Sequence, residues 1–228
     1  MKGAFASLLL LMPALAAAAE PDAPSCAQRL AAVASYTSLP ARQESSECAA
    51  DDLIRLDRVI MPDRSTVNFN PPPILSCPMA EAVSEWLRSD LGPLTVTLGA
   101  PLAAVTDLDS YGCRPRNRVV GAKISEHGRG NAIDIGAVKL ANGGVFSLTD
   151  PMTSKPFREA VRKSACARFT TVLGPGADAY HAGHIHLDLA IRSNGYRICQ
   201  WDLLEPLAEG QVPLPPRKPI PEAPDSRR

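Results

Sequence analysis

The sequence has no excess charge of either sign, few histidines and, after its first 20 residues, no long apolar run. Its 24 basic residues balance its 24 acidic ones, which argues against a nucleic-acid partner, because such partners select a basic surface. Later in the chain nothing approaches the roughly 20 apolar residues of a membrane-spanning helix. The cysteines form no C-x-x-C pair, so a cysteine-held metal knuckle is a weak interpretation. No internal repeat is evident.

The N-terminus has the pattern of a secretory signal peptide. A lysine is followed by an apolar run over residues 4–19, which ends in small residues before Glu20. This run contains Pro13 and is short for a bilayer core of about 30 Å, which disfavours a membrane anchor. We therefore expect residues 1–19 to be removed on export, and the mature protein to be periplasmic or secreted with no stable membrane insertion.

Proline marks both ends of the mature chain. Residues 21–24 and 212–228 are rich in proline, which excludes a helix or a central strand there. The tail could be a polyproline ligand or a spacer, but we expect a solvated, poorly ordered segment. A structural wall protein fits poorly, because the proline runs are confined to the ends. Residues 20–211 have the length of a single domain.

The six cysteines predict disulfide bonds. Thiols pair in an oxidising compartment, and an even number in an exported chain indicates a disulfide framework. Many pairings are possible for six cysteines. The set we expect is Cys26–Cys48, Cys77–Cys113 and Cys166–Cys199.

Hydrophobic periodicity predicts helices and strands that do not alternate regularly. Helical spacing is found over Cys26–Tyr36, Pro78–Leu91 and Pro156–Phe169. Strand-like stretches are Leu53–Ile60, Leu94–Leu98, Ala132–Val138, Thr170–Leu173 and Ile185–Ile191. This mixture predicts an α+β fold with an antiparallel sheet core and flanking helices.

All four histidines fall in two short segments, residues 125–134 and 181–188. A surface would scatter so few imidazoles, whereas their clustering with carboxylates is typical of a hydrolytic zinc site. A His-x-His pair alone is more often structural, so the prediction depends on both segments together. The residues concerned are His127, Asp134, His181, His184, His186 and Asp188.

Alternation in the second segment places its polar groups on one face. A strand through residues 184–189 would turn His184, His186 and Asp188 to one side and the intervening apolar residues to the core. In the first segment, isoleucines on either side of Asp134 turn this carboxylate away from the apolar side of its strand.

A metal site follows if the two strands are adjacent. Gly128 and Gly130 allow the preceding loop to bring His127 back toward Asp134. His127, Asp134 and His186 could then bind one Zn²⁺ or a similar divalent ion. Three such ligands leave a fourth position open, which is the arrangement that a catalytic zinc needs to acidify water.

The same residues carry a family resemblance. The pattern Ser125-x-His127-x-x-Gly130-x-Ala132-x-Asp134, followed by His184-x-His186, resembles the zinc peptidases that cut D-alanyl and related bonds of peptidoglycan. That group includes lysostaphin-type enzymes and the hedgehog fold. More closely, residues 24–202 look like the bacterial extensin-like C-terminal domain. The segments that carry this second likeness also include Tyr111-Gly-Cys-Arg114, Thr171–Gly176 and Arg197-Ile-Cys199.

The resemblance implies a fold and a set of roles. The fold would be hedgehog- or D-Ala-D-Ala-peptidase-like, with His127, Asp134 and His186 as zinc ligands. His184 matches a histidine that assists water or stabilises the tetrahedral intermediate. Arg114 would polarise the scissile carbonyl or hold a substrate carboxylate, or else it is a solvated loop charge.

Three further residues have alternative roles. Ser125 would hydrogen-bond substrate or cap a turn. His181 would assist catalysis, support another side chain or lie on the surface. Asp188 would support an imidazole rather than bind the metal, or have no role.

One position departs from the family pattern. Related peptidases often carry a Glu or Asp three residues before the last zinc ligand as general base, and the resemblance to extensin-like chains implies Asp there, but this chain has Gly183. His184 could take over, since an imidazole titrates near neutrality. We expect an exported zinc metallopeptidase that hydrolyses peptidoglycan stem peptides or cross-links. The alternative is a metal-stabilised cell-wall binding module without catalysis.

Overall fold

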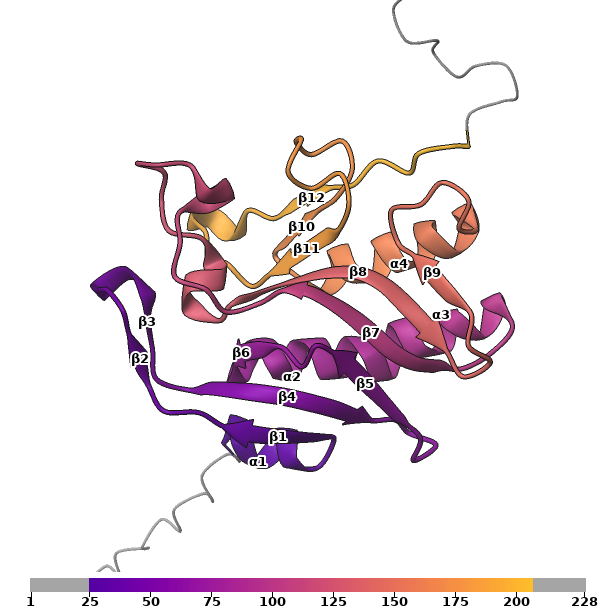
Figure 1. Cartoon of the computed structure of the whole chain (residues 1–228), viewed down its shortest axis with the longest axis horizontal. Coiled ribbons are helices and arrows are strands. Elements are labelled where there is room, and N and C mark those ends of the chain that lie inside the picture. Colours follow the sequence, from indigo (N-terminus) through magenta and orange to yellow (C-terminus); the bar gives the residue numbers. More distant parts are fainter. Residues whose placement is uncertain (1–24, 207–228) are drawn as a thin grey trace, which may run out of the picture.

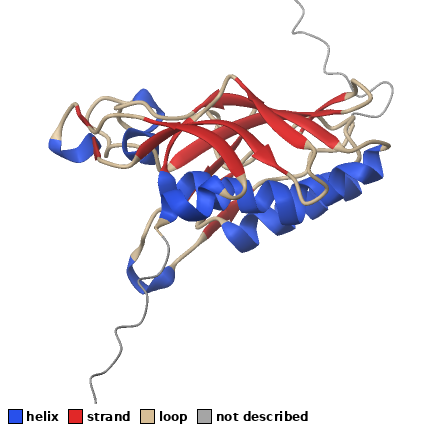
Figure 2. Cartoon of the chain, turned by 90° about the horizontal axis from the view of Figure 1, so that it is seen from below, coloured by secondary structure: helices blue, strands red, loops and turns tan. Residues whose placement is uncertain are grey.

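The structure, a computed structural model, describes residues 25–206 and has an α+β architecture (Figure 1). One large sheet carries its main helices on one face (Figure 2). The predicted signal peptide, residues 1–19, and the predicted tail, residues 212–228, lie outside the described residues. Across residues 25–206, no helix combines the length and apolar character needed to cross a bilayer.

The main sheet contains ten strands and is mixed rather than antiparallel. Its order is β1-β4-β5-β7-β8-β11-β10-β12, with β6 paired to β4 and β9 to β8. Two of its pairings, β5 with β7 and β10 with β12, are parallel. The strands are β1 Ala34–Ser38, β4 Leu53–Ile60, β5 Thr66–Asn70, β6 Ile74–Ser76, β7 Leu102–Asp109, β8 Ala132–Leu140, β9 Val145–Ser147, β10 Thr171–Leu173, β11 Ile185–Asp188 and β12 Ile198–Gln200; β2 Arg42–Gln43 and β3 Ala49–Ala50 form a separate pair.

The helices supply the apolar layer beneath the sheet. They are α1 Cys26–Ala31, α2 Cys77–Trp86, α3 Gly92–Thr95 and α4 Lys155–Arg168, with η2 Leu87–Leu91 continuing α2. The other short helices are η1 Ser46–Cys48, η3 Val96–Leu98, η4 Arg116–Arg118, η5 Glu126–Arg129 and η6 Ser193–Gly195. Trp86 of α2 packs edge-on against Phe169, with ring centroids 5.7 Å apart. Ile133 and Ile135 of β8 are fully buried in the same core, so the other face of β8 is left for polar groups.

Most of the predicted elements are present, with shifted ends. Strand Leu53–Ile60 is confirmed, and the helices predicted near residues 78–91 and 156–169 are found as α2 with η2 and as α4. The predicted helix Cys26–Tyr36 ends at Ala31, and the chain then enters β1. The predicted strand Ile185–Ile191 ends at Asp188, because the Asp188 side chain accepts a hydrogen bond from Ala190 N at 3.0 Å.

The prediction of a strand over Leu94–Leu98 is wrong. This stretch is helical, as the end of α3 and then η3. Its Val and Thr residues favour a strand, but Pro93 occupies the first turn of α3, where proline starts a helix. The run from α2 to η3 therefore forms one nearly continuous helical segment between β6 and β7.

Two of the three predicted disulfide pairings are wrong. The structure has Cys26–Cys77 and Cys48–Cys113 in place of Cys26–Cys48 and Cys77–Cys113, whereas Cys166–Cys199 is found as predicted. The first bond joins the starts of α1 and α2, which pack together. The second joins η1 to the loop after β7. Packing of elements that are distant in sequence decides these partners.

Candidate metal centre

The polar face of the sheet brings three side chains side by side on adjacent strands. In the antiparallel register, His186 of β11 lies opposite Asp134 of β8, and Asp134 lies opposite Asp109 of β7. The neighbouring pairs Ile185–Ile135 and Leu187–Ile133 alternate to the core face. The alternation predicted from sequence therefore positions Asp134 and His186 as a cross-strand pair.

His127 reaches this pair from the turn that precedes β8. Ser125 begins the short helix η5, and its Oγ accepts the backbone N–H of His127 at 3.4 Å. Gly130 ends η5 with φ of 65°, and a Cβ there would lie 2.5 Å from a side-chain carbon of Leu53. A glycine is thus required for the chain to turn back and place His127 over the sheet.

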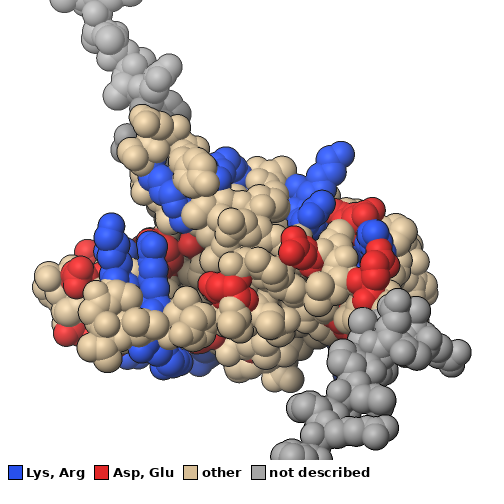
Figure 3. Space-filling model, turned by 90° about the horizontal axis from the view of Figure 1, so that it is seen from above, with Lys and Arg blue, Asp and Glu red and all other residues tan. Residues whose placement is uncertain are grey.

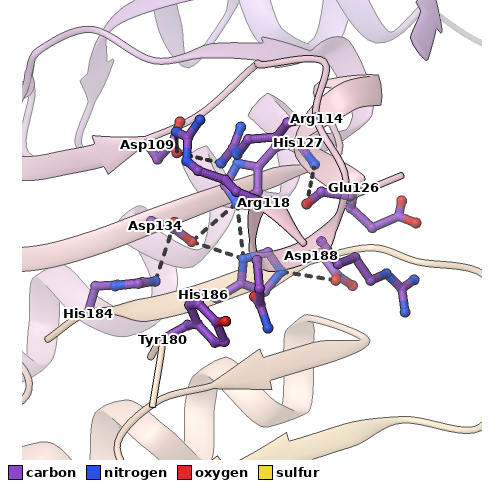
Figure 4. A pocket seen from close by; sticks show the side chains of 13 residues that line it. Asp109, Arg114, Arg118, Glu126, His127, Asp134, Tyr180, His184, His186 and Asp188 are labelled. Carbon is purple, nitrogen blue, oxygen red and sulfur yellow. Dashed lines mark hydrogen bonds and ion pairs between the residues drawn. The ribbon is translucent and has the colours of Figure 1, made fainter. Parts of the chain in front are cut away.

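Three donor atoms converge (Figure 4). His127 Nε2 lies 3.2 Å from His186 Nδ1 and 3.3 Å from Asp134 Oδ1, and His186 Nδ1 lies 2.9 Å from the same oxygen. Tetrahedral zinc with bonds of about 2.0–2.1 Å separates its ligands by roughly 3.3 Å. The donor spacing and the imidazole-carboxylate chemistry therefore fit a zinc ion.

The outer nitrogens of both imidazoles have fixed partners. His127 Nδ1 donates to the carbonyl oxygen of Ser110 at 2.6 Å, which turns Nε2 toward Asp134. His186 Nε2 donates to Asp188 Oδ2 at 3.1 Å, which turns Nδ1 inward. The structure thus places Asp188 behind an imidazole, and not among the three converging donors.

Charge in this cluster is concentrated on buried groups. Burial alone would raise the pKa of Asp134, but its contacts with His127 and His186 hold that pKa well below its usual range. Burial alone would lower the pKa of His186, but Asp134 and Asp188 outweigh it and raise that pKa to about 9. Asp134 and Asp188 therefore stay ionised, and their negative charge attracts either a protonated imidazole or a metal cation at this point.

His184 and His181 lie beside the three donors. His184 Nε2 is 3.3 Å from Asp134 Oδ2, and burial lowers the pKa of His184, which favours its neutral imidazole. The His181 ring lies 5.2 Å from the His184 ring, and its Nδ1 is hydrogen-bonded to Asp178 at 2.7 Å. His181 is 7% exposed, so the surface alternative is wrong, and its supporting or catalytic role stays a prediction.

Arg114 is held at the rim by an ion pair with Asp109 and a hydrogen bond to the carbonyl oxygen of Gly112 at 3.2 Å. Its side chain is 15% exposed, so it is not a solvated loop charge. Ser125 caps η5, as one of its two alternatives expected, and it also lines the pocket.

A pocket of about 320 Å³ opens above the donors, within the size range of small-ligand sites. Figure 4 shows His184 and Tyr180 on one side of the donors and Arg114 and Arg118 on the other. An ion bound by the three donors would therefore face a cavity large enough for a peptide segment.

Comparison with known proteins gives one match. Residues 24–200 match the family described as extensin-like protein C-terminus. The chain belongs to this family. The matched residues include all three donors of the candidate metal centre, His127, Asp134 and His186. Neither the curated proteins nor the solved structures contain a match to the chain.

Several residues of this extensin-like site were not found from sequence. Asp109 forms an ion pair with Arg114, five residues further along the chain, and lies opposite Asp134 through a strand pairing that no local pattern indicates. Asp178 precedes His181 by three residues, a spacing that could have suggested the contact. Tyr180 lines the pocket and is 55% exposed, and an isolated aromatic residue in a loop gives no signal of its own.

Proposed function

We propose that the protein is an exported zinc metallopeptidase that hydrolyses peptide bonds of peptidoglycan stem peptides or cross-links. The observation that carries the proposal is the convergence of His127 Nε2, Asp134 Oδ1 and His186 Nδ1 at the base of an open pocket. Three ligands of this type, with a vacant position toward a cavity, are the arrangement of a hydrolytic zinc rather than of a structural one.

The residues around the donors would each have a task. When bound, zinc would supply a Lewis acid and an acidified water. His184, next to Asp134 and facing the pocket, would accept the proton of the attacking water. His181, oriented by Asp178, would support His184. Asp188 would keep His186 in place through its Nε2 hydrogen bond.

Arg114 would act on the substrate from the rim of the pocket. Asp109 and the Gly112 carbonyl fix its guanidinium, which reduces the entropy lost when it binds a ligand. In that position its planar fork would polarise the scissile carbonyl or hold a substrate carboxylate. Ser125, at the pocket wall, would contact the same peptide.

Export is supported by the three disulfide bonds within residues 25–206, because such bonds persist in oxidising compartments. The periplasm or cell exterior is also where peptidoglycan is found. The proposed hedgehog- or D-Ala-D-Ala-peptidase-like relationship rests on the spacing of the two motifs and on their placement on adjacent antiparallel strands.

The test is hydrolysis of purified muropeptides by the zinc-loaded protein, followed by mass spectrometry of the products. We expect new peptide termini from the wild type, loss of activity after chelation and recovery on addition of zinc. His186→Ala should give no products with or without zinc. Identical product profiles for the wild type and His186→Ala would end the peptidase proposal.

The second candidate is a non-catalytic wall-binding module, and Gly183 is the observation that favours it. A Cβ at Gly183 would have no atom within 4 Å, so an aspartate fits there without collision. If Gly183→Asp gains hydrolysis that the wild type lacks, the chain has lost its base and retains a binding role. Sacculus binding without new termini would support the same conclusion.

A further inference from the structure

A basic arm stands over the candidate metal centre. We define it as residues 114–124, which contain three arginines, one lysine and no acidic residue in a chain of zero net charge. A β-bridge between Pro115 and Ile124 closes the arm, and Cys113 at its base is bonded to Cys48. Figure 3 shows Lys and Arg side chains that project from the left part of the face in view.

The tip of the arm is shaped to present arginines. Asn117 and Arg118 both have left-handed backbone conformations, with φ of 54° and 56°. Asparagine adopts this conformation readily, but arginine does so rarely, and such outliers concentrate at functional sites. Arg116, Asn117 and Arg118 all line the pocket above the metal donors.

The acidic groups of the pocket are already engaged. Asp109 pairs with Arg114, and Glu126 is bonded to Asn131 at 2.7 Å and to Arg129 at 3.4 Å. Asp134 and Asp188 contact the histidines.

Among the described residues, two arginines of the arm, Arg116 and Arg118, therefore lack a close ion pair. Within residues 25–206, Arg116 makes no ion pair, and Arg118 makes one contact, 3.8 Å from the already paired Asp109. The Arg118 side chain is 75% exposed.

We propose that Arg116 and Arg118 form a carboxylate-binding subsite that selects peptides with a free carboxylate near the scissile bond. Arginine forks match carboxylates in two parallel hydrogen bonds. Asp109, which contacts Arg118 at 3.8 Å, already pairs with Arg114. The inference rests on the proposed peptidase function, because it takes the scissile bond to lie at the metal donors. Arg114 is not part of this subsite, because its guanidinium is already paired with Asp109.

The fold also sets the distance between the bound substrate carboxylate and the scissile peptide bond. Arg118 is 3.8 Å from Asp109, and Asp109 is one strand away from Asp134. Neighbouring strands are about 4.8 Å apart, so the subsite lies roughly 9 Å from Asp134. An extended peptide covers about 3.3–3.6 Å per residue, so the carboxylate belongs to a residue two or three positions from the cleaved bond, or to a long side chain nearer to it.

The experiment compares muropeptides with free stem-peptide carboxylates and the same muropeptides after amidation, using zinc-loaded protein. For the double variant Arg116→Gln/Arg118→Gln, we expect KM for the free-carboxylate peptide to rise at least 10-fold with little change in kcat, and KM for the amidated peptide to stay unchanged. Lys123→Gln is the matched control, because Lys123 is on the same arm but does not line the pocket. Equal KM values of the wild type for both peptides, or an equal effect of Lys123→Gln, would overturn the subsite.

Binding separates this inference from the peptidase proposal. The zinc-loaded His184→Ala variant, titrated with fluorescent free and amidated muropeptides, reports affinity without turnover. If the wild type cleaves nothing but binding prefers the free carboxylate and loses that preference in the arm variants, the subsite stands and the peptidase proposal fails. If the wild type cleaves the free and the amidated peptides equally well, the peptidase proposal stands and the subsite fails. If the protein neither binds nor cleaves muropeptides, both proposals fail.

Discussion

The buried donor cluster and the basic arm face the same pocket but differ in how their polar groups are satisfied. In the cluster, His127 and His186 each have an outer partner and a common inner partner, Asp134. In the arm, Arg116 has no ion-pair partner among the described residues, and its side chain is exposed. Donors that are already held in place suit a permanently bound ion, whereas arginines without a strong ion pair suit a ligand that binds and dissociates.

The largest effect is expected from removing an inner ligand. His186→Ala deletes one of three donors, so zinc content should fall from about one ion per chain to a small fraction of that. Elemental analysis after dialysis measures this. His181→Ala is the matched histidine control and should keep its zinc, because His181 is not among the converging donors. Loss of zinc in both variants to the same extent would break the distinction between ligand and support.

The base of the arm offers the next test. Replacing Cys48 and Cys113 together by serine removes a cross-link that spans 65 residues, and the expected loss of stability is about 2–5 kcal/mol by denaturant unfolding. The arm should also exchange its amide hydrogens faster. The control removes Cys26 and Cys77, whose bond spans 51 residues and lies away from the pocket. That variant should lose similar stability but keep the exchange rates of the arm, and faster exchange in both would contradict the pinning role.

One buried carboxyl group, that of Asp107, lacks the full set of hydrogen-bond partners that the groups of the donor cluster have. Asp107 on β7 is 3% exposed, and its Oδ1 has no hydrogen-bond partner among the described residues. Burial raises the pKa of Asp107 to about 7, which the Ser110 contact only partly offsets. Because folding raises the pKa of Asp107, the folded protein loses stability as the pH rises from about 4, the ordinary pKa of an aspartate, through about 7.

Asp107→Asn should remove this loss. We expect the variant to be more stable than the wild type at pH 8 by on the order of 2–4 kcal/mol, with a smaller difference at pH 4. Denaturant unfolding at both pH values gives the answer. An unchanged pH dependence would mean that Asp107 titrates normally.

The outer partner of His186 should matter less than the ligand itself. Asp188→Asn keeps the shape of the side chain but weakens the hydrogen bond to Nε2, and zinc affinity should fall about 10- to 100-fold. Competition with a zinc-binding dye measures this affinity. If the variant binds zinc as tightly as the wild type, Asp188 does not support the metal site, and its only role is the hydrogen bond with Ala190 N at the end of β11.

The smallest effect on stability is expected in the arm. Arg116→Gln/Arg118→Gln alters exposed side chains, so the free energy of unfolding should stay within about 0.5 kcal/mol of the wild type. Thermal and denaturant unfolding measure this difference. A larger loss would mean that these arginines support the fold, which would remove the contrast with the cluster.

The sequence predicted the parts of the site that depend on local alternation. Isoleucines beside Asp134 and the alternation around His186 fixed which face each group occupies, and the structure pairs these two residues directly. The α+β class and the bounds of Leu53–Ile60 followed from the same periodicity.

Contacts between distant segments were beyond local patterns. Strand β7 was missed, because its sequence Leu-Ala-Ala-Val-Thr-Asp-Leu-Asp lacks a clean alternation, and Asp107 and Asp109 were missed with it. The partners of Cys26 and Cys48 depend on how α1, α2 and η1 pack, which spacing does not encode. The parallel pairing of β5 with β7 likewise depends on the long helical crossover between them.

The most direct measurement is anomalous X-ray diffraction at the zinc edge from crystals grown with Zn²⁺. The account predicts one strong peak about 2.0–2.2 Å from His127 Nε2, Asp134 Oδ1 and His186 Nδ1, with its remaining position open to the pocket. No peak among these three atoms, or a zinc ion held by other side chains while these three point apart, would contradict it.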